Sequence, residues 1–359
     1  SILMFPLLHD SARISYAGRN LALVLLVLGA LLPAVSPAHA QTPVANIGDI
    51  AVYNNAGASD VNITHEGGAT PTVINAYSNT VVAPLTSYVL ESAGDGVKLS
   101  AGKHLVLYNV RVDRSSGSNR SEMLTHLTLE NGGVTNALAY GRAQGFVRYG
   151  SGADECVISG GTIVDASAND ILRLHTSRTD VNSGQTSKIV SGQTAIQLLK
   201  LDDSLDYLRL RRAANTAGAT STTFADVTYD TVDEASSGAM SFTATSGDIT
   251  FNNAGYYLVL ANTHLKRTDS REFSGTASST TRGGYTQRLR LNTTTIPGSL
   301  TTSYIRGSQN AEEADDGTLT IGAIINVSAS DVLSVEHMKE YGVNNNIISN
   351  KTALAIVKL

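Results

Sequence analysis

Short apolar runs divided by polar turns make up most of the chain. In the stretch that begins at His104, every second residue is apolar and bulky, which predicts a strand with one face in a core. The residues of that face are Val106, Tyr108, Val110 and Val112. Clusters such as Asn131-Gly132-Gly133 separate runs of this kind. After Ala40 no run of a dozen residues keeps a helical apolar period free of glycine or β-forming residues, so the pattern predicts an all-β chain.

The strand pattern occurs twice. GKHLVLYNVRVDRS begins at Gly102, and GYYLVLANTHLKRT begins 153 positions later at Gly255. Three further matches follow in the same order, at offsets of 162, 161 and 158. Offsets that differ by a few residues indicate loop-length changes around a repeated scaffold. We therefore predict two tandem jelly-roll-like antiparallel β-sandwich domains, residues 41–201 and 202–359. No proline-rich or glycine-serine linker divides them, which predicts closely set domains.

The repeated strand is apolar on its second face as well. Leu105 and Leu107 lie on that face, and Leu258 and Leu260 are their counterparts in the second copy. A strand that is covered on one side only alternates cleanly between apolar and polar residues. We therefore predict that the four leucines are interface residues, covered by the sister domain or by another subunit.

The first forty residues have the order of a secretory signal. Arg13 and Arg19 precede the apolar run 21–32, and Ser36-Pro37-Ala38-His39-Ala40 follows it. The run is shorter than the roughly 20 residues that a spanning helix needs. We predict that residues 1–40 are a signal peptide with upstream residues, that cleavage follows Ala40, and that no membrane span remains. The chain is then secreted or extracellular.

Composition narrows the class of protein. With 42% hydrophobic and 16% charged residues among 359, the chain is globular rather than disordered. Its net charge of −5 does not indicate a nucleic-acid partner. Cys156 is the one cysteine, which excludes a disulfide scaffold and favours a bacterial envelope or exterior for an exported protein. Its apolar neighbours predict a buried side chain.

The second copy resembles a known family. FADVTYDTV from Phe224, GDITFNNAGYYLVLANTHL, ASDVLSVEH and the closing TALAIVKL follow one another as strands do in the globular-head jelly roll of the complement and tumour-necrosis-factor superfamily. Gly255-Tyr256-Tyr257, Ser330-Asp331-Val332 and residues 354–359 carry the resemblance. In the first copy, Gly102 and Asn169-Asp170-Ile171 match. The resemblance implies a jelly-roll fold and a homo-oligomer, with a trimer favoured.

No catalytic motif is present. The six histidines after Ala40 form neither a His-x-His nor a His-Glu-x-x-His pair, and no Gly-x-Ser-x-Gly elbow occurs. Four of these histidines lie in strand-like runs, which predicts structural roles for them. We therefore name no catalytic residue and no required cofactor, and predict that the chain is not an enzyme.

Two charged segments are candidates for ligands. Four carboxylates crowd one predicted loop, which is either a solvated turn or a calcium site; they are Glu312, Glu313, Asp315 and Asp316. Arginines interspersed with acidic residues follow both copies of the repeated strand, and form either a salt-bridged surface or ligand-binding loops. The ligand-loop candidates are Arg114, Arg120, Arg267 and Arg271.

Three functions fit these features. The first is a secreted non-enzymatic binding or structural assembly protein, which self-associates through sandwich faces and presents loops to a glycan or a cell-surface ligand. The second is a lectin-like carbohydrate-binding protein that uses tyrosines as stacking platforms. The third is a hydrolase whose dispersed carboxylates meet only in three dimensions.

Overall fold

The computed structural model contains strands and no helix in the part of the chain that it describes. The described residues are 49–55, 60–63, 72–73, 79–82, 87–92, 94–116, 120–138, 140–148, 155–178, 186–202, 205–236, 238–269, 282–306 and 316–359. Within them, no helix is present that could cross a membrane. The predicted signal peptide, residues 1–40, lies outside this part.

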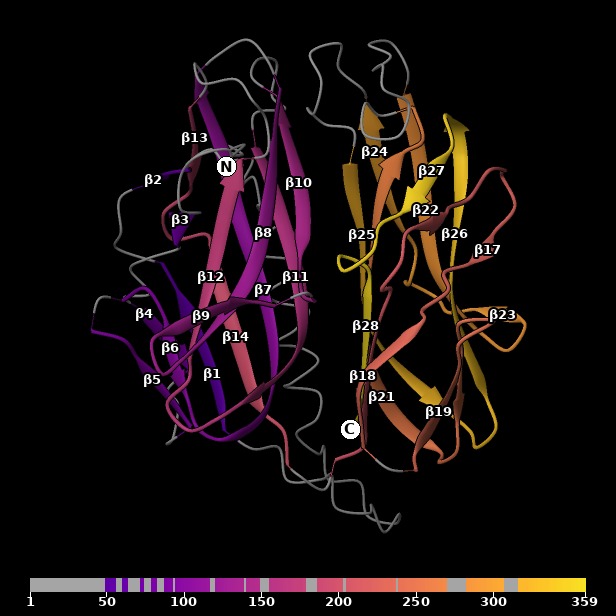
Figure 1. Ribbon diagram of the computed structural model, residues 1–359, viewed down its shortest axis with the longest axis horizontal. Coiled ribbons are helices and arrows are strands. Elements are labelled where there is room, and N and C mark those ends of the chain that lie inside the picture. The colour runs from indigo at the N-terminus through magenta and orange to yellow at the C-terminus, as the bar shows by residue number, and fades with distance from the viewer. Residues whose placement is uncertain are drawn as a thin grey trace, which may run out of the picture. The chain divides into compact units, whose positions relative to one another are not determined.

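The first sandwich runs from indigo to magenta in Figure 1. Its strands are β1 (Ile50–Asn54), β2 (Val61–Asn62), β3 (Thr72–Val73), β4 (Asn79–Val82), β5 (Tyr88–Leu90), β6 (Val97–Leu99), β7 (Gly102–Ser116), β8 (Arg120–Asn131), β9 (Val134–Ala137), β10 (Ala143–Arg148), β11 (Glu155–Ala166), β12 (Ile171–Arg178), β13 (Thr186–Ile189) and β14 (Ala195–Lys200). One sheet has the order β2-β13-β7-β14-β1-β4, and β11 pairs with β7. The other has the order β10-β8-β12-β6-β5, with β3 on β12 and β9 on β8.

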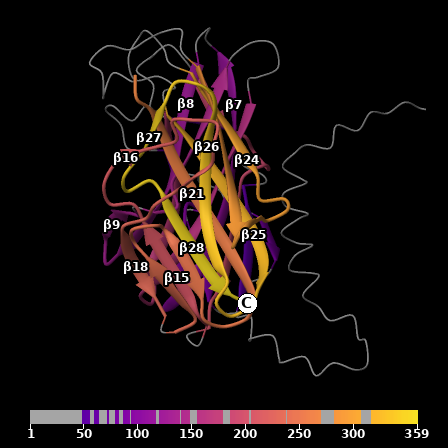
Figure 2. The ribbon, with the colours of Figure 1, turned by 90° about the vertical axis from the view of Figure 1, so that its right-hand side faces the viewer.

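The second sandwich runs from rose through orange to yellow, and Figure 2 shows its strands from another side. Its strands are β15 (Tyr207–Arg211), β16 (Thr216–Ala217), β17 (Ala225–Asp226), β18 (Thr231–Ala235), β19 (Met240–Thr243), β20 (Asp248–Phe251), β21 (Gly255–Arg267), β22 (Arg282–Leu291), β23 (Thr294–Thr295), β24 (Thr301–Arg306), β25 (Asp316–Val327), β26 (Val332–Gly342), β27 (Asn345–Ile347) and β28 (Ala353–Lys358). One sheet has the order β16-β27-β21-β28-β15-β18, and β25 pairs with β21. The other has the order β19-β20-β26-β22-β23, with β17 on β26 and β24 on β22.

The two sandwiches place their repeated strands alike. In the first, β7 pairs with β11 and with β14, and Leu105 faces Ile163. In the second, β21 pairs with β25 and with β28, and Leu258 faces Ile324. All of these pairings are antiparallel. The prediction of an all-β chain with two jelly-roll-like antiparallel β-sandwiches is confirmed, and the passage between them falls after Lys200 and before Tyr207.

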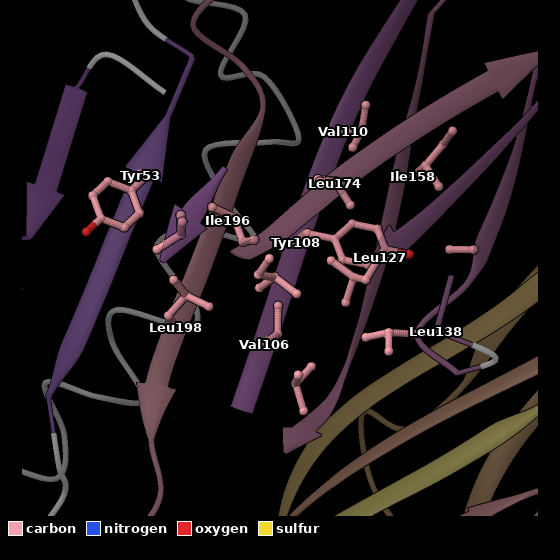
Figure 3. Packing of buried hydrophobic residues seen from close by; sticks show 14 of the residues in the cluster. Tyr53, Val106, Tyr108, Val110, Leu127, Leu138, Ile158, Leu174, Ile196 and Leu198 are labelled. Atoms are coloured by element: carbon pink, nitrogen blue, oxygen red, sulfur yellow. The ribbon is translucent and has the colours of Figure 1, made fainter. Parts of the chain in front are cut away.

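Each sandwich has its own core. The predicted inner face of β7 lies in the first core, where Figure 3 shows Val106, Tyr108 and Val110 along one strand beside Leu127. The buried Tyr108 hydroxyl donates to the Gly141 carbonyl at 2.7 Å, which satisfies the polar tip of a core side chain. The second core holds the corresponding residues of β21. Alternation along each strand therefore determines which side chains enter the core.

Candidate functional site

The four leucines predicted as interface residues meet in a third apolar cluster. Leu105 and Leu260 are buried in it, at 5% and 8% exposure, and Leu107 and Leu258 are partly buried against it. The other members come from both sandwiches and from the connection between them; they are Ile163, Leu199, Leu201, Leu205, Tyr207, Ala355 and Val357. The cover for the second face of the repeated strand therefore comes from the sister sandwich of the same chain.

Side chains of the second sandwich bind the backbone edge of β11. Three alternate carbonyls along this strand each accept a hydrogen bond. Thr320 Oγ1 donates to the Ser159 carbonyl at 3.4 Å, and Asn262 Nδ2 donates to the Gly161 carbonyl at 3.3 Å. Arg209 donates to the Ile163 carbonyl. Polar side chains of one sheet thus satisfy the strand edge that another sheet leaves unpaired, and this protects the edge from pairing with a further strand.

Gly161 permits the close approach of the two sandwiches. A Cβ at this position would lie 2.6 Å from Leu107 Cδ2 and 3.3 Å from Leu260 Cδ1. The first distance is shorter than a van der Waals contact, so a larger residue would displace the leucine that belongs to the same interface. Close packing of the two sandwiches therefore explains why a glycine occurs in the middle of β11.

Arg209 is the central charged group of the interface. Its guanidinium lies over the Tyr140 ring at 3.7 Å, and its Nη2 is 3.4 Å from Glu234 Oε2. Glu234 also pairs with Lys103 of the first sandwich, at 3.2 Å. Burial opposes the charge on Lys103, but hydrogen bonds with Tyr207 and Glu234 outweigh it and raise the pKa of this amine. The arrangement forms a chain of alternating charges from one sandwich to the other.

A buried imidazole connects a second set of contacts. His264 Nε2 is 3.1 Å from Asp316 Oδ2, and His264 Nδ1 is 3.0 Å from Thr318 Oγ1. Because the carboxylate only accepts, the neutral ring donates from Nε2 and accepts the threonine proton at Nδ1. Burial lowers the pKa of His264 to about 4, and the charge of Lys351 adds to the effect.

The same network holds the two sandwiches together. Burial would raise the pKa of the Asp316 carboxyl, but the His264 hydrogen bond and nearby lysines outweigh it, and the pKa is held well below its usual range. The Thr318 hydroxyl, the His264 imidazole and the Asp316 carboxylate are hydrogen-bonded in the order of a nucleophilic triad. Here, however, Thr318 Oγ1 also accepts the Gln144 N–H of β10 at 3.1 Å. The hydroxyl is thereby engaged in an inter-sandwich contact, which assigns the group a structural role.

The predicted acidic loop is only partly described. Glu312, Glu313 and Asp315 lie outside the described residues, and Asp316 begins β25. Lys266 Nζ lies 3.4 Å from the Asp316 carboxylate, on the side opposite the His264 contact. Among the described residues, no group of three or more His, Cys, Asp or Glu side chains could hold a metal ion.

We expect calcium to leave the melting temperature unchanged. Asp316 is neutralised by its histidine and lysine contacts, so only three of the four predicted carboxylates are left to bind a cation. Thermal unfolding in millimolar calcium and in a chelator should therefore give the same midpoint. A midpoint raised by calcium but not by magnesium would show that the loop binds calcium without Asp316.

The ligand-loop prediction needs a correction at two positions. Arg114 and Arg267 lie in β7 and β21, and each is only 1% exposed. Both strands continue further than the charge pattern suggests. Arg267 is buried with its charge paired to Asp269, with 2.5 Å between Nη2 and Oδ2. These two guanidinium groups are therefore not presented on loops. The Arg120 side chain and Arg271 lie outside the described part.

Sequence reasoning missed the polar residues that bind the β11 edge. Asn262 and Thr320 face each other across β21 and β25, and Arg209 comes from β15. One signal was available: Asn262 and its counterpart Asn109 are polar residues that follow the two leucines in an otherwise apolar strand. No signal in the sequence shows which carbonyls these side chains reach.

Comparisons with known proteins give only distant likenesses. No family model matches the chain. No curated protein matches it either. Murine APRIL at pH 5.0 is 12% identical over 44% of this chain and 100% of its own, with a TM-score of 0.29. Eiger TNF from S. frugiperda is 16% identical over 44% of this chain and 95% of its own, with a TM-score of 0.30. Because these TM-scores lie below 0.5, the fold assignment rests on the strand order and pairing described above.

Proposed function

We propose that the chain is a secreted, non-enzymatic binding and assembly protein that associates with copies of itself through the edge of β25. The observation that carries the proposal is the equivalence of β25 and β11. Thr320, Gly322 and Ile324 occupy the register positions of Ser159, Gly161 and Ile163 relative to the central strand. The first sandwich uses this edge for docking, and the second sandwich carries the same edge.

The β25 edge is open around Gly322 within the described part of the chain. Gly322 is exposed, and a Cβ there would meet only Leu260 Cδ2, at 3.4 Å. Its counterpart Gly161 is crowded by Leu107 and Leu260. Thr318 and Thr320 of β25 contact the first sandwich, whereas Gly322 and Asn326 are exposed, so the part of the edge around these two residues is a site for association. A second copy of the chain is the partner that we propose for this edge.

The proposed contact joins unlike surfaces. The edge of one copy would meet a sheet face of the next, as the β11 edge meets the outer face of the β21 sheet within the chain. Such head-to-tail contacts build closed rings or open filaments, according to the rotation between copies. The trimer implied by the family resemblance is one closed form. Loops at the ends of the sandwiches would then be presented several times to a ligand.

Arginine at Gly322 is expected to abolish the association. A long charged side chain would lie on the edge without entering either core, because the position is exposed. Size exclusion with light scattering should give a multiple of the chain mass for the wild type and the mass of one chain for Gly322→Arg.

Ser241→Arg is the matched control, because Ser241 is exposed on β19 of the same sandwich, in the other sheet. This variant should retain the wild-type mass. A wild-type protein that stays monomeric at high concentration would overturn the proposed assembly, and so would a Gly322→Arg variant that retains the oligomer.

A further inference from the structure

Two exposed tyrosines flank a glycine on the sheet of the second sandwich that contains β22. Gly284 of β22 pairs with Tyr304 of β24 on one side and with Tyr341 of β26 on the other. The tyrosines are 44% and 51% exposed. Their neighbours Tyr285 and Ile305 point into the core, so Gly284 and Tyr304 belong to the outer face.

Gly284 leaves space for the Tyr341 ring. A Cβ at Gly284 would lie 2.5 Å from Cε1 and 2.8 Å from Cζ of Tyr341. The Tyr341 ring therefore occupies the space above β22 that any other residue would fill, and it is supported by backbone instead of extending freely into solvent. We call Tyr304, Gly284 and Tyr341 the tyrosine platform. It covers three neighbouring strands, a width of roughly 10 Å for a strand spacing of about 4.8 Å.

Polar groups border the platform on the same strands. Thr302 is exposed on β24, two residues before Tyr304, and it pairs with Thr286 of β22. The Thr286 hydroxyl donates to Glu340, which is exposed next to Tyr341. Hydroxyl and carboxylate groups therefore lie beside the exposed rings, where they can bond to the hydroxyls of a ligand that stacks on the rings.

The first sandwich has a different residue in place of the glycine. Glu122 pairs with Phe146 of β10 as Gly284 pairs with Tyr304 of β24. Glu122 is buried, at 2% exposure, where the second sandwich has a glycine. The two copies therefore share a scaffold but differ in the residue at this position.

We propose that the tyrosine platform binds an extended oligosaccharide of β-linked hexopyranoses. Sugars of this kind present flat C–H faces, which stack on tyrosine rings, and equatorial hydroxyls, which bond to groups at the border. The platform lies on an open sheet face and spans three strands, which fits a chain of several sugars lying across the strands. Tyrosine supplies this contact area at a low cost in conformational entropy.

Calorimetric titration tests the proposal with cellohexaose and chitohexaose as β-linked probes and maltohexaose as the α-linked comparison. The wild type is expected to bind at least one β-linked probe and to bind maltohexaose at least tenfold more weakly. Tyr304→Ala and Tyr341→Ala should each weaken binding tenfold or more. Gly284→Ala should weaken it to a similar extent while both tyrosines remain, because the new methyl group displaces the Tyr341 ring.

Tyr256→Ala is the matched control, because Tyr256 is 57% exposed in the same sandwich but belongs to the β21 sheet. It should bind as the wild type does, and thermal unfolding should show all four variants folded. The proposal is overturned if the wild type binds neither β-linked probe at millimolar concentration, if it binds maltohexaose equally well, or if the platform variants bind as tightly as Tyr256→Ala. Light scattering on the same variants should give the wild-type mass, so failure of sugar binding is distinguishable from failure of assembly.

Discussion

Replacing Leu260 by aspartate is expected to separate the two sandwiches and to split their unfolding. Leu260 lies in the shared apolar cluster beside Ile163 and Tyr207. A carboxylate there loses the leucine packing and must be desolvated without a partner, which costs at least about 3 kcal/mol. We expect differential scanning calorimetry to show one transition for the wild type and two for Leu260→Asp, with the first at a lower temperature.

The control for this variant is Tyr256→Asp. Tyr256 lies four residues earlier in β21, on the same face, but it is exposed rather than buried in the cluster. It should unfold in one transition near the wild-type temperature. If Leu260→Asp also unfolds in a single transition at that temperature, the shared cluster does not couple the two sandwiches.

Acid is expected to destabilise the protein well above the pH at which carboxylates titrate. Burial lowers the pKa of His264 and of His337 from 6.5 to about 4. Below pH 6.5 the unfolded chain takes up these protons and the folded chain does not, so stability is lost as pH falls from 6.5 to about 4. Each histidine accounts for a loss of about 3 kcal/mol over this interval. Asp316, with its depressed pKa, contributes stability that is lost at still lower pH.

Urea unfolding at pH 7, 6, 5 and 4 measures this loss. The free energy of unfolding should fall steadily across the series for the wild type. His337→Gln, which removes one buried titrating group, should lose less between pH 7 and pH 4. A wild-type stability that stays constant down to pH 4 would show that these histidines titrate alike in the folded and unfolded chains.

The sequence predicts the fold well because alternation has a direct structural meaning. A period of two places Val106 and Tyr108 on one face, and the structure has them in the core. The doubled pattern likewise predicts two sandwiches of one kind. The apolar second face indicates that Leu105 and Leu260 are covered, but the sequence of a strand does not show which surface covers it. The structure supplies that answer, which is the sister sandwich.

The candidate sites were less accessible to sequence reasoning. The docking edge of β11 consists of backbone carbonyls, and every residue type has one. Arg114 and Arg267 stand in charged stretches that suggest loops, yet both are buried in strands, and Arg267 forms an ion pair with Asp269. The tyrosine platform joins Gly284 to residues 20 and 57 positions later, so no local motif could indicate it. In each case the site depends on contacts between residues of different strands, and these contacts do not follow from the pattern along one strand.

Amide hydrogen exchange along β25 and β11, followed as the chain concentration is raised, tests self-association through the β25 edge most directly. Because β11 is covered within the chain, its amides should be protected equally at every concentration. The amides of β25 that do not bond to β21 should exchange rapidly in dilute protein and slow down as copies associate, and in Gly322→Arg they should remain fast throughout. Rapid exchange of β25 in a sample that light scattering shows to be oligomeric would contradict the account, because the copies would then meet at another surface.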